Sequence, residues 1–256
     1  MNSPTVALAS LGFAGEYWQS NPRLYEGYEQ LQQLYKSLGR KVSSSDVAYQ
    51  LSRNLLSEVL VAAGGIEGAL MRLRAAIAEL QVWVVDNQLK AQPGIPQGLG
   101  HAAAVDAWFA FAELLMWSRT LVERMERRAS SPKKFPKQGL LPALKPKRLK
   151  SRCEKIFAIL QHSPVGQCRT LANFVLHTGL VNHPHTGARL EPSGAIVLPI
   201  PQLPIRPVAH WYLFSWQPGH DGVVLAEEMW RHVQIFVDDL LAAFEKAAPK
   251  RMRRNL

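Results

Sequence analysis

A long apolar periodicity between residues 47 and 85 constrains the fold more than any other feature of the sequence. Large apolar residues recur there at intervals of three and four, the spacing that gathers side chains on one side of an α-helix. Similar stretches cover 102–127 and 225–244. Helices this long are stable when each buries its apolar side against another helix. The apolar positions of the first stretch are Val47, Leu51, Leu55, Val59, Leu70, Leu73, Ile77, Leu80 and Val84.

Local signals place the ends of further elements. Because glycine is unfavourable inside helices, the Gly64–Gly65 pair predicts a kink or break in the first helix. Shorter helices are expected over 24–38, over 149–161 and over 163–179, the last with Ser163 as its N-cap. Within 102–127 the expected inward residues are Val105, Phe109, Leu114, Trp117, Leu121 and Met125.

Glycine and proline punctuate the rest of the chain. Residues 91–100 are expected to form a loop, and 189–200 a short hairpin with its turn at 192–194. Asp221 is expected to cap the last helix. The predicted fold is mainly α, an antiparallel bundle of four to five helices with a small extended or β-hairpin insertion before the last helix. The expected regions are a lead-in with a short helix (1–43), long bundle helices (44–129), a basic linker or insertion (130–152), the motif helix, insertion and last helix of the same bundle (153–248), and a basic tail (249–256).

Positive charge is concentrated in 130–152. The 256-residue chain has 30 Lys and Arg against 20 Asp and Glu, and this segment holds eight of the basic residues and no acidic one. Such a segment can follow a phosphate backbone without reading base sequence. The alternative is a solvated linker kept soluble by its charge. The candidate nucleic-acid-binding residues are Lys133, Lys134, Lys137, Lys145, Lys147, Arg148, Lys150 and Arg152.

Several classes of site and location are disfavoured. Cys153 and Cys168 are the two cysteines, which suits a reducing compartment rather than a disulfide framework. The sequence shows neither a signal-like start nor an apolar run of about 18 residues, so we expect a cytoplasmic protein without a membrane partner. No phosphate-loop, dinucleotide or zinc-protease motif occurs, so no cofactor is expected. His177, His183 and His185 lie near Cys168, but no further ligand stands at a metal-site spacing, so no metal is expected.

Arg169, Asn173 and His177 fall four residues apart and therefore share one polar stripe of the 163–179 helix. A guanidinium, an amide and an imidazole on one stripe can bind a phosphate and move a proton. A hydrated surface is the alternative interpretation of the same stripe.

The segment Asn173–His177, Asn-Phe-Val-Leu-His, resembles the end of the motif of the HEPN superfamily. That motif is an arginine, often followed by a polar residue, and a histidine a few residues later, on a late helix of a helical bundle. The order of elements over 44–247 is also similar. Asn173 fits the polar position and His177 the histidine, whereas Ala172 stands where the family has arginine.

The resemblance implies a homodimer in which two such motifs face each other and cleave RNA without a metal, in a toxin or phage-defence setting. His177 would act in acid–base catalysis on the 2′-hydroxyl, Asn173 as a phosphate- or ring-orienting donor, and Arg169 as a displaced charge stabiliser. The alternative is a non-enzymatic helical accessory protein that binds nucleic acid or a protein partner through its basic segments. Pro201–Pro207 could dock on a partner's aromatic groove or wrap against its own chain.

Overall fold

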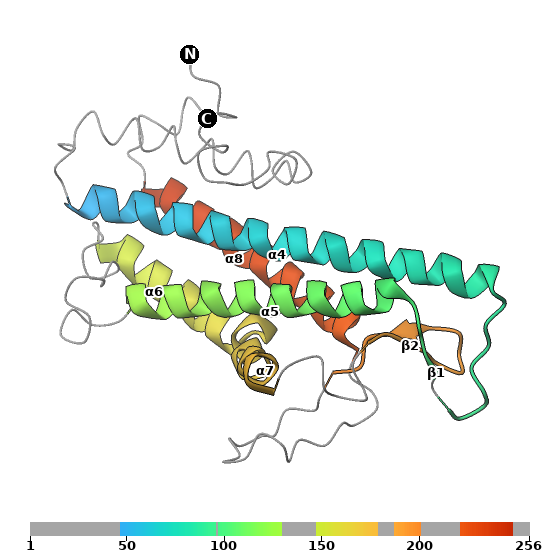
Figure 1. The fold of residues 1–256 in the computed structure, drawn as a ribbon. Helices are drawn as coiled ribbons and strands as arrows, with labels where there is room; N and C mark the ends of the chain where they lie inside the picture. The colour runs from blue at the N-terminus through green and yellow to red at the C-terminus, as the bar shows by residue number, and fades with distance from the viewer. Residues whose placement is uncertain (1–46, 96, 130–146, 179–186, 201–220, 248–256) are drawn as a thin grey trace. The chain divides into compact units, whose positions relative to one another are not determined.

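Helices dominate the part of the chain that the structure describes (Figure 1). This computed structural model describes residues 47–95, 97–129, 147–178, 187–200 and 221–247. Five helices and three short strands lie in these ranges, which confirms the predicted fold class. The helices are α4 (Val47–Asp86), α5 (Ala102–Ala129), α6 (Lys147–His162), α7 (Pro164–Thr178) and α8 (Gly222–Ala247), and the strands are β1 (Gln97–Gly98), β2 (Arg189–Leu190) and β3 (Ile196–Val197).

The chain divides into two compact units. One combines residues 65–122 with 161–232, and the other combines 1–64 with 123–160 and 233–256. The long helices α4, α5 and α8 contribute residues to both. The first unit holds the sheet and α7, and the second holds most of α6.

Helix α4 is continuous through Gly64 and Gly65, so the predicted break is wrong. The glycine at position 65 makes room for a side chain of another helix. A Cβ atom on Gly65 would stand 2.3 Å from Cδ2 of Trp117 on α5, well inside van der Waals contact. Gly65 therefore allows the indole to approach the α4 backbone, and it does not end the helix.

Three contacts set the register between α4 and α5. Trp117 covers Gly65, Glu113 pairs with Arg72, and Nδ1 of His101 lies 3.9 Å from Oε1 of Glu79. The partners rise along α4 as they fall along α5, so the two helices are antiparallel, as the bundle prediction requires.

The rotation of α5 differs in part from the prediction. Leu114, Leu121 and Met125 are buried as expected, but Val105 and Phe109 are 52% and 53% exposed. The inward side near the start of α5 instead contains alanines, Trp108 and Phe111. Small alanines contribute little to a pattern judged on large side chains, which explains the error.

A small antiparallel sheet joins two distant connections of the chain. β2 pairs with β3 in the predicted hairpin, where Gly194 adopts a φ of 85° that glycine tolerates. β1 pairs with β2, with Gln97 opposite Leu190. The prediction of an unpaired loop over 91–100 is thus wrong at two residues, because a strand this short leaves no alternating pattern.

Asp221 caps α8, as predicted, and also anchors the sheet. Its Oδ1 accepts hydrogen bonds from the backbone N–H of Val223 at 2.9 Å and of Leu198 at 3.0 Å. One carboxylate oxygen therefore satisfies a free donor of the helix start and a donor that follows β3.

In the other unit, α6 and α8 share an aromatic contact. The rings of Phe157 and Phe236 have centroids 5.7 Å apart. Their neighbours at helical spacing are buried, which gives each helix one core side and one exposed side. The buried neighbours are Cys153, Ile156 and Leu160 on α6 and Val233, Val237 and Leu240 on α8.

Candidate nucleic-acid interface

Helix α6 is the most basic of the described helices. Its 16 residues include five Lys or Arg and one Glu, whereas α8 has two basic and five acidic residues. The basic residues begin in the first turn, where the positive end of the helix dipole adds to their field. This concentration favours an anionic ligand on α6.

The basic side chains of α6 that the structure describes point away from the core. Arg152 and Lys155 are exposed, beside the buried side of α6 that includes Ile156 and Phe157. Helical spacing places Arg148 one turn before Arg152 on the same side. Lys155 lies outside the basic segment predicted from the sequence, although its spacing of three from Arg152 indicates the same side of the helix. We call Arg148, Arg152 and Lys155 the α6 basic face.

Other sequence-predicted binding residues cannot be placed. Lys133, Lys134, Lys137 and Lys145 lie outside the described residues, as do Pro201–Pro207, the expected 24–38 helix and the basic tail. Lys147, Arg148 and Lys150 lie in the first turn of α6, with side chains outside the described part of the chain.

Helix α7 carries Arg169 and Asn173 next to the side that packs into the core. It follows Ser163, whose carbonyl accepts the Gln167 N–H at 3.2 Å. Arg169 and Asn173 are half-buried and one turn apart. His177 follows one turn later, in the last turn of α7, and its side chain is outside the described part. The buried side consists of Val165, Cys168, Leu171, Ala172 and Val175.

The departure from the HEPN motif has a structural counterpart. Ala172 is 0% exposed, so the position where that family has arginine faces the core of this unit. A guanidinium there would have to be buried, which is costly without a paired anion. Arg169 lies three residues before Ala172, next to the buried side of α7, and its Nε is buried. Residue 172 therefore supplies no cation to this helix, and Arg169 is the arginine of α7.

The two thiols are unsuited to nucleophilic or metal chemistry. Burial raises the pKa of Cys153 and of Cys168 to about 12, and nearby Glu154 adds to the shift of Cys153. Sγ of Cys168 lies 2.9 Å from the Pro164 carbonyl oxygen and 3.0 Å from Sδ of Met229, which ties α7 to α8. Both thiols are therefore protonated at neutral pH. Among the described residues no three His, Cys, Asp or Glu side chains gather as a metal site.

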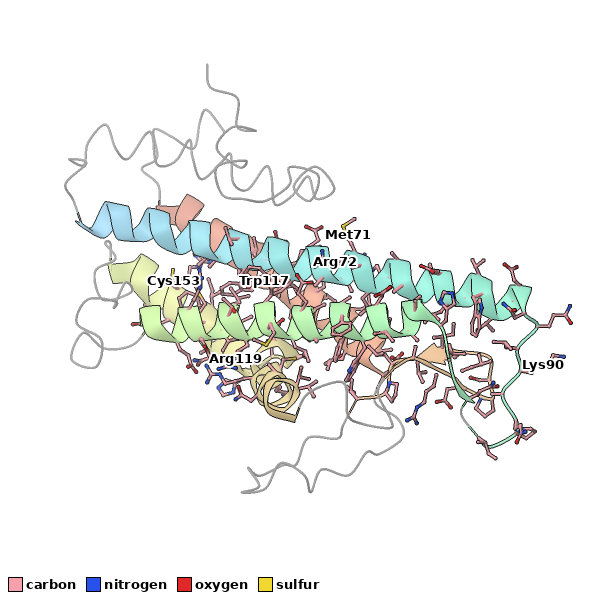
Figure 2. All side chains as sticks on the ribbon, in the orientation of Figure 1. Met71, Arg72, Lys90, Trp117, Arg119 and Cys153 are labelled. Atoms are coloured by element: carbon pink, nitrogen blue, oxygen red, sulfur yellow. The ribbon has the colours of Figure 1, made fainter. Side chains whose placement is uncertain are left out.

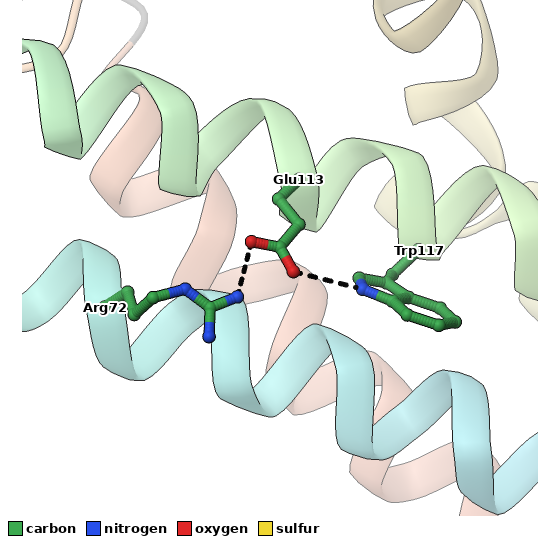
Figure 3. A network of polar contacts seen from close by, with 3 residues as sticks. All are labelled: Arg72, Glu113 and Trp117. Atoms are coloured by element: carbon green, nitrogen blue, oxygen red, sulfur yellow. Dashed lines mark hydrogen bonds and ion pairs between the residues drawn. The ribbon is translucent and has the colours of Figure 1, made fainter. Parts of the chain in front are cut away.

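A polar network between α4 and α5 was not predicted. Figure 3 shows the Glu113 carboxylate between Arg72 and Trp117, with one oxygen directed at each. The indole Nε1–H donates to Oε1 of Glu113 at 3.4 Å. The Arg72 and Glu113 side chains are 44% and 45% exposed, so solvent screens the ion pair and its role is to fix register.

A second bridge joins α4 to α8. Arg74 donates from Nε and Nη2 to the two carboxylate oxygens of Glu227, each at 2.6 Å. This hydrogen-bonded pairing raises the pKa of Arg74 above its ordinary value. In each bridge a glutamate carboxylate already pairs with the arginine guanidinium. The two bridges therefore hold helices together and are not candidate sites for an anion.

Comparisons with protein families, with characterised proteins and with solved structures find no match to this chain. Among the described helices, none is long and apolar enough to span a membrane.

Proposed function

We propose that this chain binds RNA or another nucleic acid in the cytoplasm, through phosphate contacts made by the α6 basic face. The observation that carries the proposal is the charge of α6, five basic residues to one acidic, with Arg152 and Lys155 exposed. Arg and Lys are the side chains that neutralise phosphates, and contacts of this kind position a nucleic acid without reading its bases.

The spacing of the α6 basic face suits a phosphate backbone. From Arg148 to Lys155 the helix rises about 10 Å. Nucleotides advance by roughly 3.4 Å along one strand of a duplex, so three cations over this length can follow about three phosphates. Ile156 and Phe157 anchor one side of α6 in the core, so Arg152 and Lys155 stand on a packed helix.

Removing two of these charges should weaken binding. For Arg152→Gln with Lys155→Gln we expect the affinity for a 20-nucleotide single-stranded RNA to fall roughly tenfold or more for each lost contact, since a charge-assisted hydrogen bond contributes about 1.5–3 kcal/mol. The slope of log K against log salt should become shallower by about 0.7 for each lost contact. Fluorescence anisotropy over a salt series measures both quantities.

The matched control is Lys90→Gln with Arg231→Gln. Both residues are exposed and lie outside α6, and the pair removes the same formal charge. Equal losses in the two double variants would show that only net charge matters, and the assignment to α6 would then be wrong. A parent protein that does not bind RNA or duplex DNA in low salt would contradict the proposed function itself.

Metal-independent RNA cleavage is the second candidate function, in a toxin or phage-defence role. It is supported by the half-buried positions of Arg169 and Asn173, one turn apart on the same side of α7 as His177 in the helical register. Imidazole can exchange a proton near neutral pH, and guanidinium can stabilise charge on a phosphate.

The cleavage test is an RNA digestion in excess EDTA with the parent, His177→Ala and Arg169→Ala. A ribonuclease of this kind cuts without metal, and His177→Ala lowers the rate at least a hundredfold, as expected for loss of a general acid–base. If the parent does not cut the RNA but anisotropy detects binding, the ribonuclease hypothesis is wrong and the chain is a binding protein. Cleavage retained by His177→Ala would exclude His177 as the catalytic residue.

A further inference from the structure

Helix α4 has a second apolar stripe on the side opposite its core contacts. Met71, Ala75, Ala78, Val82 and Val85 follow one another at alternating intervals of four and three, and all five are exposed. The exposed fractions are 41% for Met71, 61% for Val82 and 72% for Val85. In Figure 2 the labelled Met71 side chain projects from α4 away from α5. We call these five residues the α4 outer face.

The core does not account for this stripe. The core side of the same stretch is already supplied by Leu70, Leu73, Ile77 and Leu80, which are buried. On a helix that only covers a core, the opposite side is normally polar. An alternating spacing of three and four is the seam along which two helices pair, and contiguous exposed apolar surface marks interaction sites.

We propose that the α4 outer face binds the same face of a second copy of this chain, with the two α4 helices antiparallel about a two-fold axis. The proposal goes beyond nucleic-acid binding and does not depend on it. A two-fold interface must be complementary to itself, so the face can be tested for that property in size and in charge.

The sizes of the side chains are self-complementary in this arrangement. An antiparallel pairing that sets Ala78 opposite Val82 of the other copy also sets Ala75 opposite Val85. The layers formed by Ala75, Ala78, Val82 and Val85 then each join one alanine and one valine, which fills this part of the seam evenly, while Met71 lies at its end. A parallel pairing would set each residue against itself, with thin alanine layers beside wide valine layers.

The charges at the two ends of the stripe are complementary in this arrangement, whereas the glutamates at its centre face each other. Arg72, Glu79 and Asp86 recur every seven residues along one edge of the stripe, and all three are exposed. In the antiparallel register Arg72, which also pairs with Glu113 of its own chain, comes opposite Asp86 of the other copy, and the two-fold axis repeats this arrangement. Glu79 meets its own counterpart at the axis, and each Glu79 has the His101 ring of its own chain 3.9 Å away.

This location differs from the one that the HEPN resemblance implies. There the two-fold axis would bring together the late motif helix, which is α7 here. In Figure 1, within the unit that holds them, α7 and the C-terminal part of α4 lie on opposite sides of α5. A dimer through the α4 outer face therefore leaves the α7 stripes of the two copies apart.

The first test is sedimentation velocity of the full chain over a concentration series. The stripe is only about 21 Å long, so the series extends to about 1 mM. We expect the parent to dimerise, and Val82→Glu with Val85→Glu to raise the dimer Kd at least tenfold. The control, Val224→Glu with Ile235→Glu, alters residues on α8 that are 56% and 50% exposed, and should leave the Kd unchanged. A parent that stays monomeric, or equal effects of the two pairs, overturns the proposal.

Cysteine cross-linking tests the orientation and does not require a disruptive variant. Ala75→Cys and Val85→Cys are made separately, and the native thiols are buried. Residues 75 and 85 are about 15 Å apart along the helix, beyond disulfide reach. In the antiparallel dimer, oxidation of an equal mixture gives the 75–85 cross-linked dimer, while each variant alone gives none. Cross-linking of Val85→Cys alone, or no cross-link in the mixture, overturns the proposal.

Discussion

Gly166→Ala should lower the free energy of unfolding by about 3 kcal/mol, a shift of roughly 6–12 °C in Tm for a chain of this size. A Cβ atom on Gly166 would lie 2.0 Å from the carbonyl oxygen of Gln161 and 2.5 Å from its carbonyl carbon. Both atoms are backbone, at the end of α6. A side-chain rotation cannot relieve the clash, so α7 must move away from the turn that positions it.

Ordinary helix propensity predicts the opposite sign. Replacing glycine by alanine inside a helix stabilises it by about 0.5–1 kcal/mol when space allows. The expected destabilisation is therefore net of that gain. Thermal and urea unfolding followed by circular dichroism measure it.

Gly100→Ala is the matched control. No atom lies within 4 Å of the position that its Cβ would take, and its backbone has no positive φ. We expect a change within about 0.5 kcal/mol. If Gly166→Ala behaves like Gly100→Ala, the close approach of α7 to the end of α6 is contradicted.

Structural features with local signals were predictable from the sequence, whereas features that depend on a distant residue were not. The ends of α7 and the Asp221 cap were predictable because their signals are local, one to three residues from the groups that they satisfy. The prediction for Gly65 was wrong because this glycine makes room for Trp117, which lies on another helix. A glycine that ends a helix and a glycine that admits a neighbour look alike in a single sequence.

The candidate site divides in the same way. The basic run and the spacing of Arg169 and Asn173 are local patterns. Of the basic run, the structure shows Arg152 exposed on α6, and it shows Arg169 and Asn173 half-buried on α7. The bridge from Arg74 to Glu227 joins residues far apart in the chain, so no local spacing in the sequence indicates it. Likewise, the α4 outer face became visible only when the structure showed which of two apolar stripes the core uses.

The second large expected effect concerns two phenylalanines of α5. The sequence predicts that Phe109 is buried and does not include Phe111 in the core, whereas the structure shows the reverse. Periodicity of large residues assigned Phe109 to the core and left out Phe111. In the structure Phe111 is 0% exposed and stacks on Trp108 with ring centroids 5.7 Å apart, while Phe109 is 53% exposed.

Phe111→Ala should therefore cost about 3–5 kcal/mol, since it removes a buried ring and leaves a cavity beside Trp108. Phe109→Ala should cost less than about 1 kcal/mol because much of that ring is already in water. The two variants remove the same atoms two positions apart on one helix, so helix propensity cancels in the comparison. Urea unfolding at one dilute protein concentration measures both. A larger loss for Phe109→Ala would mean that α5 is rotated as the sequence alone predicts, and would contradict the α4–α5 register set by Trp117 and Gly65.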